Sequence, residues 1–244
     1  MQPEIVEQLL ALNHQFYQTF ALQFSATRQR LQPGVRRVLD GLPSPAKLLD
    51  LGCGNGELAR DLARRGWQGT YVGLDFSAGL LAEAALDQPE TPALDCRFAQ
   101  VDLADPNWAA AVADYQPDLI LAFAVLHHLP GSDLQRRLLA QVRRMLSPNG
   151  HFIFSTWQFL ESQRLRARIQ AWQEAGLVES DVEPGDYLLD WRQGGRGLRY
   201  VHAFGPAELA RLAEQTGFVS LESFYSDGEG GRLGLYQVWG LQDT

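Results

Sequence analysis

The stretch LLDLGCGNG, residues 48–56, decides how this chain folds. An apolar run contains an aspartate, three glycines follow at alternate positions, and the helix-forming segment ELARDLA comes next at 57–63. This order predicts a buried parallel strand, a tight turn and the N-terminus of a helix, with the backbone of the turn open to a ligand. Glycine suits such a turn because it adopts positive φ freely and presents no Cβ to the ligand.

The spacing of these glycines indicates which ligand the turn binds. The dinucleotide pattern G-x-G-x-x-G needs glycine or alanine at its third conserved position, where this chain has Glu57. The chain instead shows D-x-G-x-G-x-G, with the carboxylate of Asp50 just before the turn. A carboxylate there suits a ligand with a positive charge, such as the ammonium of a methionyl group. The alternative is a glycine-rich turn that only reverses the chain.

This pattern resembles the first cofactor motif of the class I S-adenosylmethionine-dependent methyltransferases. The resemblance implies S-adenosylmethionine as cofactor and an α/β fold. That fold is a Rossmann-like, doubly wound, seven-stranded sheet with an antiparallel last strand, N-terminal helices and an inserted substrate lid. The residues that we predict to bind the cofactor are Tyr17, Asp50, Gly52, Cys53, Gly54, Gly56, Asp75, Phe76, Asp102, Leu103 and Ala122.

Two later segments supply acids for the same pocket. Residues 71–75 predict a strand that ends in Asp75, about twenty residues beyond the glycines, where an acid can accept both hydroxyls of a ribose. Phe76 follows and can lie against the adenine face. Residues 96–103 predict a third strand, and in the resembled family the acid that closes it, here Asp102, accepts a hydrogen bond from the adenine amino group. The alternative for both acids is a structural one, because strand ends and helix N-caps favour aspartate.

A fourth strand is predicted over residues 118–125, where the continuous apolar run suits a central strand buried on both faces. Its carboxyl end is where an open α/β sheet places its ligand. His127 and His128 follow directly, and the resemblance implies that the pair overlooks the transferable methyl. Either can act as a base or bind the substrate, since an unperturbed histidine has a pKa of roughly 6.5. The alternative is a pair that only packs or caps near the strand end.

The order of elements predicts one domain in four parts. Helices occupy 1–45, the cofactor-binding core 46–156, an insertion 157–204, and a final helix with a β-hairpin 205–244. The long insertion follows the carboxyl end of a strand, which favours a substrate lid. We expect it to contain one arginine-rich helix with a solvated face, an acidic stretch and a flexible Gly/Arg loop.

Two short motifs narrow the resemblance. FSATR at 24–28 and RYVHAF at 199–204 are similar to segments of the tRNA methyltransferases that esterify carboxymethyluridine at the wobble position. The resemblance implies tRNA as partner, and eukaryotic members also work with a small activating protein that binds zinc. It gives candidate catalytic residues and, with the arginines and aromatics of the Gly/Arg loop, candidate substrate-binding residues. The catalytic candidates are His127, His128 and Arg28; the substrate-binding candidates are Trp191, Arg199, Tyr200 and His202.

Composition limits the alternatives. The net charge of −8 and the pI of about 5.1 disfavour a broad surface for nucleic-acid phosphates, although every basic residue except Lys47 is an arginine. The only cysteines are Cys53 in the turn and Cys96 in a predicted strand, and no Cys/His spacing indicates a metal site. We therefore expect a cytoplasmic enzyme with reduced thiols. No leader or membrane-spanning stretch is apparent.

The acceptor determines what the site residues must do. A carboxylate acceptor is already ionised and needs a cationic clamp, for which Arg28 and Arg199 are candidates; Arg28 can instead bind the methionyl carboxylate of the cofactor. A hydroxyl or amine acceptor needs a base, for which His127 or His128 is available. Three other functions stay open: methylation of a small metabolite, cofactor binding without catalysis in an activator or scaffold, and hydride transfer.

Overall fold

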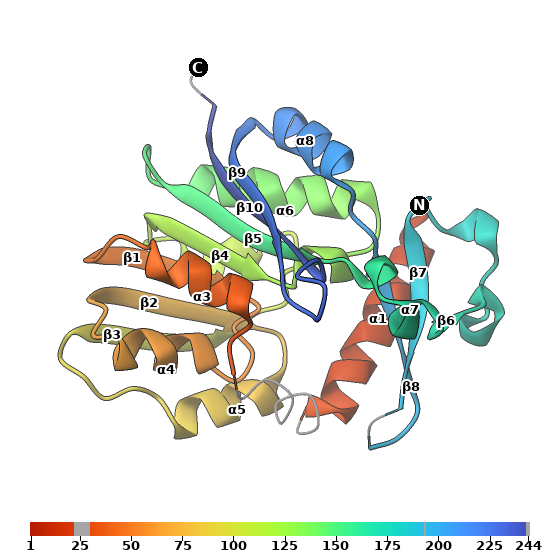
Figure 1. Ribbon diagram of the computed structural model, residues 1–244, viewed down its shortest axis with the longest axis horizontal. Coiled ribbons are helices and arrows are strands. Elements are labelled where there is room, and N and C mark those ends of the chain that lie inside the picture. Colours follow the sequence, from red (N-terminus) through yellow and green to blue (C-terminus); the bar gives the residue numbers. More distant parts are fainter. Residues whose placement is uncertain (22–29, 193, 243–244) are drawn as a thin grey trace.

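The computed structural model describes residues 1–21, 30–192 and 194–242 (Figure 1). Its larger sheet has seven strands in the order β3-β2-β1-β4-β5-β10-β9. The first five are parallel, whereas β10 runs antiparallel to both β5 and β9. The bounds are β1 (Ala46–Leu51), β2 (Gly69–Asp75), β3 (Leu94–Gln100), β4 (Leu119–Phe123), β5 (His151–Trp157), β9 (Phe218–Ser226) and β10 (Gly234–Leu241).

Helices cover both faces of this sheet, with α3, α4 and α5 in front and α6 and α8 behind in Figure 1. Leu58 and Leu62 of α4 pack on one face, and Leu138 and Val142 of α6 pack on the other. Their spacing of four residues puts each pair on one side of its helix. The bounds are α3 (Pro33–Asp40), α4 (Glu57–Arg64), α5 (Ala78–Leu86), α6 (Ser132–Met145) and α8 (Pro206–Gln215), with the 3₁₀ turns η1 (Trp108–Val112) and η2 (Leu126–His128).

The insertion folds into a second, three-stranded antiparallel sheet of order β6-β7-β8. The prediction of a flexible Gly/Arg loop was therefore wrong for residues 197–202, which form β8. The reason is the alternation along this strand, because Leu198 and Tyr200 pack on the opposite side from Arg199. The bounds are β6 (Ile169–Gln170), β7 (Asp186–Trp191), β8 (Gly197–His202), α7 (Gln163–Arg166), η3 (Phe159–Glu161), η4 (Trp172–Ala175) and η5 (Glu179–Asp181).

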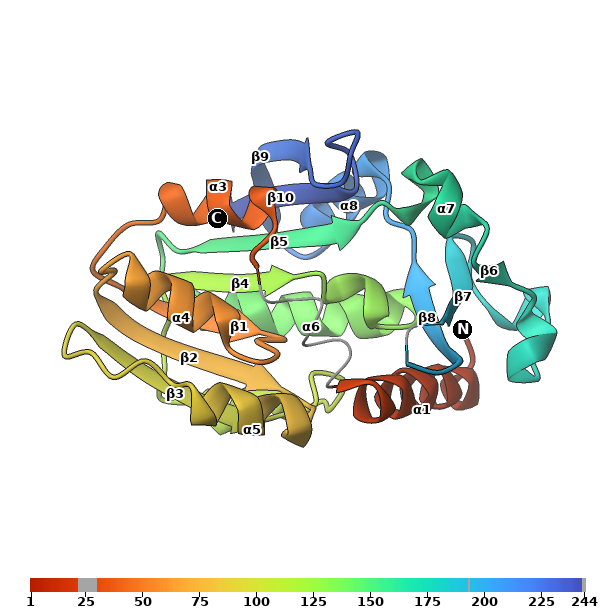
Figure 2. The same cartoon turned by 60° about the horizontal axis from the view of Figure 1, so that its bottom comes forward.

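The first helix, α1 (Pro3–Thr19), packs mainly against this small sheet, and Figure 2 shows it beside β8. Leu9 of α1 contacts the cluster that contains Leu188 and Tyr200. Asn13 fixes the pairing, since its side chain both donates to and accepts from the backbone of Tyr200, at 3.2 and 2.8 Å. The N-terminal helix and the insertion thus form one wall opposite the carboxyl edge of the larger sheet.

The predicted fold class is confirmed, from the glycine turn to the antiparallel last strand. Two strand ends were predicted too late: β3 ends at Gln100 rather than at residue 103, and β4 ends at Phe123 rather than at 125. In the second case Ala124 has φ of +58°, a conformation that stops a strand. In the described part of the chain, no helix is long and apolar enough to cross a membrane.

Candidate active site

A cavity of about 550 Å³ lies between the carboxyl edge of the larger sheet and the wall made by α1 and the insertion. Most of the predicted site residues line it, although they come from segments far apart in the sequence. Those residues are Tyr17, Asp50, Gly52, Cys53, Gly54, Asp75, Phe76, Asp102, Leu103, His127, His128, Trp191 and Arg199. The structure therefore brings the cofactor motifs and the histidine pair to one place.

The glycine turn has the backbone that its sequence predicts. Gly52, Gly54 and Gly56 all have positive φ, between +56° and +77°. A Cβ on Gly52 would lie 2.4 Å from a methyl carbon of Val125, so only glycine fits between β1 and the loop after β4. Gly56 also has no room for a side chain, but it packs against α5 and does not line the cavity.

Asp50 lies at the base of the turn and is almost completely buried. Its Oδ2 accepts a hydrogen bond of 2.5 Å from the hydroxyl of Tyr71. The pKa of the Asp50 carboxyl is raised to about 7, mainly by burial and to a smaller extent by the nearby Asp75, against the lowering effect of that hydrogen bond. A cationic ligand near Asp50 would favour the ionised carboxylate, which fits the charge of a methionyl ammonium or a sulfonium.

Asp75 ends β2 and ties the glycine turn to the next loop. Its two carboxylate oxygens accept hydrogen bonds from the backbone N–H of Gly54, at 2.9 Å, and of Ser77, at 2.8 Å. Burial raises the pKa of the Asp75 carboxyl, although these backbone hydrogen bonds oppose the shift. The carboxylate is thus held in one orientation at the cavity wall, as an acceptor for vicinal hydroxyls must be.

An aromatic ring and an acid lie next to Asp75. Phe76 lines the cavity and stacks on the ring of His14, with 4.5 Å between ring centroids and 27° between planes. The Oδ2 of Asp102 is 3.4 Å from Nε2 of the same histidine. Burial alone would raise the pKa of Asp102, but hydrogen bonds from His14 and from the backbone N–H of Ala104 outweigh it and lower the pKa.

Hydrogen bonds fix the orientation of both histidine rings. His127 accepts from the backbone N–H of Trp157 through Nδ1, at 3.3 Å. His128 lies 3.2 Å from the carbonyl oxygen of Tyr200 through Nδ1 and 2.8 Å from the hydroxyl of Tyr17 through Nε2. A carbonyl only accepts, so Nδ1 of His128 carries a proton, and in the neutral ring Nε2 accepts from Tyr17.

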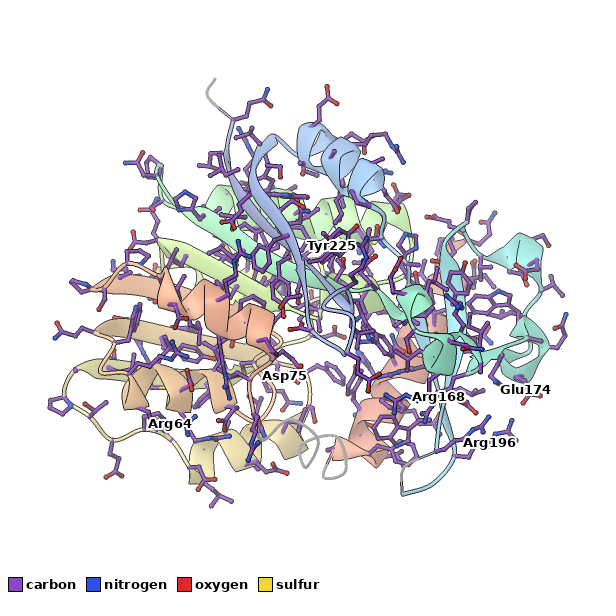
Figure 3. The ribbon with its side chains drawn as sticks, in the orientation of Figure 1. Arg64, Asp75, Arg168, Glu174, Arg196 and Tyr225 are labelled. Carbon is purple, nitrogen blue, oxygen red and sulfur yellow. The ribbon has the colours of Figure 1, made fainter. Side chains whose placement is uncertain are left out.

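The opposite side of the cavity is basic and aromatic. The guanidinium carbon of Arg199 lies 4.6 Å from the ring centroid of Trp157, 5.3 Å from that of Phe16 and 5.7 Å from that of Trp191. Arg164 and Arg168 line the same cavity, and Figure 3 shows Arg168 on the side of the small sheet, across from Asp75.

Sequence reasoning missed this part of the wall. Arg164 and Arg168 were assigned to a solvated helix face. Arg164 is exposed on α7 as predicted and Arg168 lies beyond the end of this helix, but both also line the cavity. Within the described residues neither forms an ion pair. Trp157 was treated only as the start of the insertion. No local pattern marks these residues, because their role depends on how the insertion folds back over the sheet.

Besides Gly56, three predicted residues lie away from the cavity. Tyr200 and His202 point into the insertion, where both contact Oδ1 of the buried Asp186, at 2.6 and 2.7 Å, and His202 also contacts Glu208. The structure therefore does not bring them to a substrate, contrary to the prediction. The side chain of Ala122 is buried in the core on β4. Arg28 lies outside the described residues.

Comparison with known proteins agrees with this geometry. A family model described as a methyltransferase domain matches residues 24–223. A protein of Encephalitozoon cuniculi named as a methyltransferase is 30% identical over 220 residues, which is 86% of this chain and 88% of that protein. This chain belongs to the S-adenosylmethionine-dependent methyltransferases. S-adenosylmethionine is accordingly the cofactor of this family.

Two other relatives have names that state an acceptor. A tRNA (carboxymethyluridine(34)-5-O)-methyltransferase of Arabidopsis thaliana is 28% identical over 75% of this chain, which spans 41% of the plant protein. A trans-aconitate 2-methyltransferase of Acidovorax sp. is 41% identical over 44% of this chain, which spans 37% of that enzyme. The structure of DhpI in complex with S-adenosylmethionine has the same fold, with a TM-score of 0.66 at 22% identity, over 98% of this chain and 99% of that one.

Proposed function

We propose that this methyltransferase transfers its methyl group to a carboxylate oxygen, and that the acceptor is carboxymethyluridine at the wobble position of a tRNA. The observation that carries the carboxylate is the hydrogen bonding of the histidine pair. The acceptor groups of both rings are already engaged: Nδ1 of His127 by the N–H of Trp157, and Nε2 of His128 by the hydroxyl of Tyr17. A neutral pair in this arrangement has no ring nitrogen available as a base.

A carboxylate is the acceptor that needs no base. Carboxyl groups have reference pKa values near 4, so the acceptor is ionised at neutral pH and can attack directly. A hydroxyl or an amine would have to lose a proton during transfer, and the step would lack an obvious acceptor for it. In its neutral form His127 carries its proton on Nε2, since Nδ1 accepts from the N–H of Trp157.

The basic wall provides the clamp that a carboxylate requires. Arginine offers a planar, permanently charged fork that matches a carboxylate in two parallel hydrogen bonds. Arg199 is buried among three aromatic rings, which limits the positions of its guanidinium group. Arg164 and Arg168 supply further positive charge in the same cavity. Arg28 stays a candidate for the clamp or for the methionyl carboxylate of the cofactor.

The other end of the cavity holds the cofactor in this proposal. Asp75 accepts from the ribose hydroxyls, Phe76 and Asp102 contact adenine, and Asp50 lies near the cationic methionyl end. When bound, S-adenosylmethionine supplies an electrophilic methyl group on a sulfonium. The residues of the two ends hold acceptor and donor in line, and such positioning contributes up to roughly 7–11 kcal/mol to the acceleration.

A small carboxylic acid is the second candidate acceptor. The trans-aconitate 2-methyltransferase of Acidovorax shares higher identity over a shorter stretch, and its named substrate also bears carboxylates. The net charge of −8 favours this alternative, because a long RNA contact surface is normally basic. If the acceptor is tRNA, a small activating protein would supply the missing contacts to the RNA. Such a partner is what the sequence resemblance implies.

One labelling experiment separates these acceptors. The purified protein is incubated with methyl-labelled S-adenosylmethionine and either bulk tRNA that contains carboxymethyluridine or a tRNA-free metabolite extract. Label in tRNA that mild alkali releases as methanol is expected, because esters hydrolyse under these conditions. Alkali-labile label only in metabolites would replace tRNA by a small acid and keep the carboxylate. Alkali-stable label in either pool would contradict the carboxylate proposal.

A further inference from the structure

His14 makes two contacts in the cavity that the preceding proposal assigns to the adenine of the cofactor. Its ring stacks on Phe76, with 4.5 Å between the ring centroids and 27° between the planes. Its Nε2 lies 3.4 Å from Oδ2 of Asp102, the carboxylate that the proposed function assigns to adenine. His14, Phe76 and Asp102 all line the cavity, so the three groups face the same space.

The distance between the two rings decides whether adenine can share this space. A base sandwiched between two aromatic rings separates them by two stacking distances, about 7 Å. The rings of His14 and Phe76 are in direct contact, so no base fits between them. The imidazole therefore occupies one face of Phe76, the face that it shares with the cavity next to Asp102.

We propose that His14 is a built-in stand-in for adenine, which S-adenosylmethionine must displace in order to bind. The proposal rests on the adenine contacts of the proposed function. Without the cofactor, the stack on Phe76 and the contact with Asp102 help to hold α1 in place. When the cofactor enters, both contacts pass from the imidazole to the base, and part of the binding free energy is used to release His14.

The position of His14 on α1 links this exchange to the acceptor end. Its neighbour Asn13 bonds the backbone of Tyr200, and Tyr17, one turn further along, bonds His128. Release of His14 therefore loosens one of the contacts that hold α1 over the cavity, while the contacts near the acceptor remain. The cofactor and the N-terminal helix thus compete for the same two groups of the core.

Titration calorimetry with S-adenosylhomocysteine and with adenosine tests the competition. His14→Ala removes the stand-in, and we expect the protein to bind both ligands about three- to tenfold more tightly, the value of a lost aromatic stack. Gln15→Ala, on the exposed side of the same helix, is the matched control and should bind as the unchanged protein does. Unchanged binding by the His14 variant would overturn the proposal. Weaker binding would also overturn it, because it would mean that His14 contacts the bound base.

Two further variants test the proposal if His14→Ala is unstable and separate it from the proposed adenine site. His14→Asn has a polar side chain that cannot stack, and it should reproduce the tighter binding if the alanine variant is unstable. Phe76→Ala tests the adenine site itself and should weaken binding of both ligands. Normal binding by that variant would refute the adenine contacts, whereas tRNA or acid specificity has no effect on any of these measurements.

Discussion

The two ends of the cavity are built in different ways. The cofactor end consists of Asp50, Asp75 and Asp102, which lie on or just after consecutive strands of the larger sheet. The acceptor end consists of arginines and aromatic rings from β5, α7, β7, β8 and α1, together with Arg168 between α7 and β6. The cofactor end arises from short motifs, each of which is a strand followed by a loop. The acceptor end forms only when α1 and the insertion pack together.

Their electrostatics differ in the same way. Burial raises the pKa of Asp50 and Asp75 at the cofactor end, because removal from water disfavours the charged form of each carboxyl. The acceptor end holds permanently charged guanidinium groups, with Arg199 packed among aromatic rings. Each end thus carries a charge that a ligand of opposite sign would stabilise. Substitutions at one end should change cofactor affinity, and those at the other should change acceptor kinetics.

The largest effect is expected at Asp75. Replacing it with alanine removes the acceptor for the N–H groups of Gly54 and Ser77 as well as for the proposed ribose hydroxyls. Hydrogen bonds to a charged group contribute about 1.5–3 kcal/mol each, so affinity for S-adenosylhomocysteine should fall at least a hundredfold. Calorimetry measures it, with the exposed Asp95→Ala as control. A loss below threefold would exclude Asp75 from the cofactor site.

The second effect should appear only in the acceptor kinetics. Arg199→Lys keeps the charge but loses the planar fork, so kcat/KM for a carboxylate acceptor should fall by about 30- to 100-fold, or about 2–3 kcal/mol. Affinity for S-adenosylhomocysteine should not change. Arg192→Lys is the matched control, since Arg192 is exposed and pairs with Asp190. An equal loss in both variants would mean that Arg199 has no special contact with the acceptor.

Asp50 links the cofactor end to pH-dependent stability. Its pKa is raised from 3.8 to about 7, so the folded state binds the proton more tightly than the unfolded state. The resulting stabilisation is complete below pH 3.8 and is lost as the pH rises through 7. Asn does not titrate, so Asp50→Asn does not lose this stabilisation. The free energy of unfolding of the variant minus that of the unchanged protein should therefore be about 2–3 kcal/mol larger at pH 8 than at pH 5.

Urea unfolding of both proteins at the two pH values measures this difference without ligand. Because Asp75 remains in each protein, its own titration largely cancels in the comparison. A difference in unfolding free energy that is the same at pH 5 and pH 8 would show that Asp50 does not hold the proton.

A smaller effect of the same sense is expected in the insertion, at a higher pH. Burial alone would lower the pKa of His202, but Asp186 and Glu208 raise it from 6.5 to about 9. This stabilisation is complete below pH 6.5 and is lost as the pH rises through 9. His202→Asn should therefore cost about 1–2 kcal/mol more at pH 6 than at pH 10, reduced because the carboxyl of Glu208 is partly exposed. A cost independent of pH would assign His202 a packing role only.

The smallest expected effect concerns catalysis itself. With cofactor and acceptor both saturating, kcat should change less than about twofold between pH 6.5 and 8.5, since a carboxylate needs no base. Saturating cofactor is essential because the pKa of Asp50 falls inside this range. A rate that rises tenfold with each pH unit at the acid side would show that a histidine acts as the base.

The sequence by itself determined the larger sheet and the cofactor end. Buried strands, the glycine turn and the acids at strand ends are local patterns, and their spacing follows from how parallel strands bring their carboxyl edges together. For this reason Asp50, Asp75, Phe76 and the histidine pair were predicted to lie near one another, and they line one cavity. The ends of the strands were predicted less accurately. β4 stops before Ala124 because this residue has positive φ, and nothing in the sequence indicates that conformation.

Only the tertiary structure decided the acceptor end. Side chains alternate along β8, so that Arg199 faces the cavity while Tyr200 and Leu198 pack toward α1. The prediction of one flexible loop assigned Arg199 and Tyr200 to the same substrate site, although they lie on opposite faces of a strand. His14 and Arg168 have no local motif at all. They reach the cavity because Asn13 fastens α1 to β8 and because the insertion folds back over the sheet, and such contacts between distant segments leave no period in the sequence.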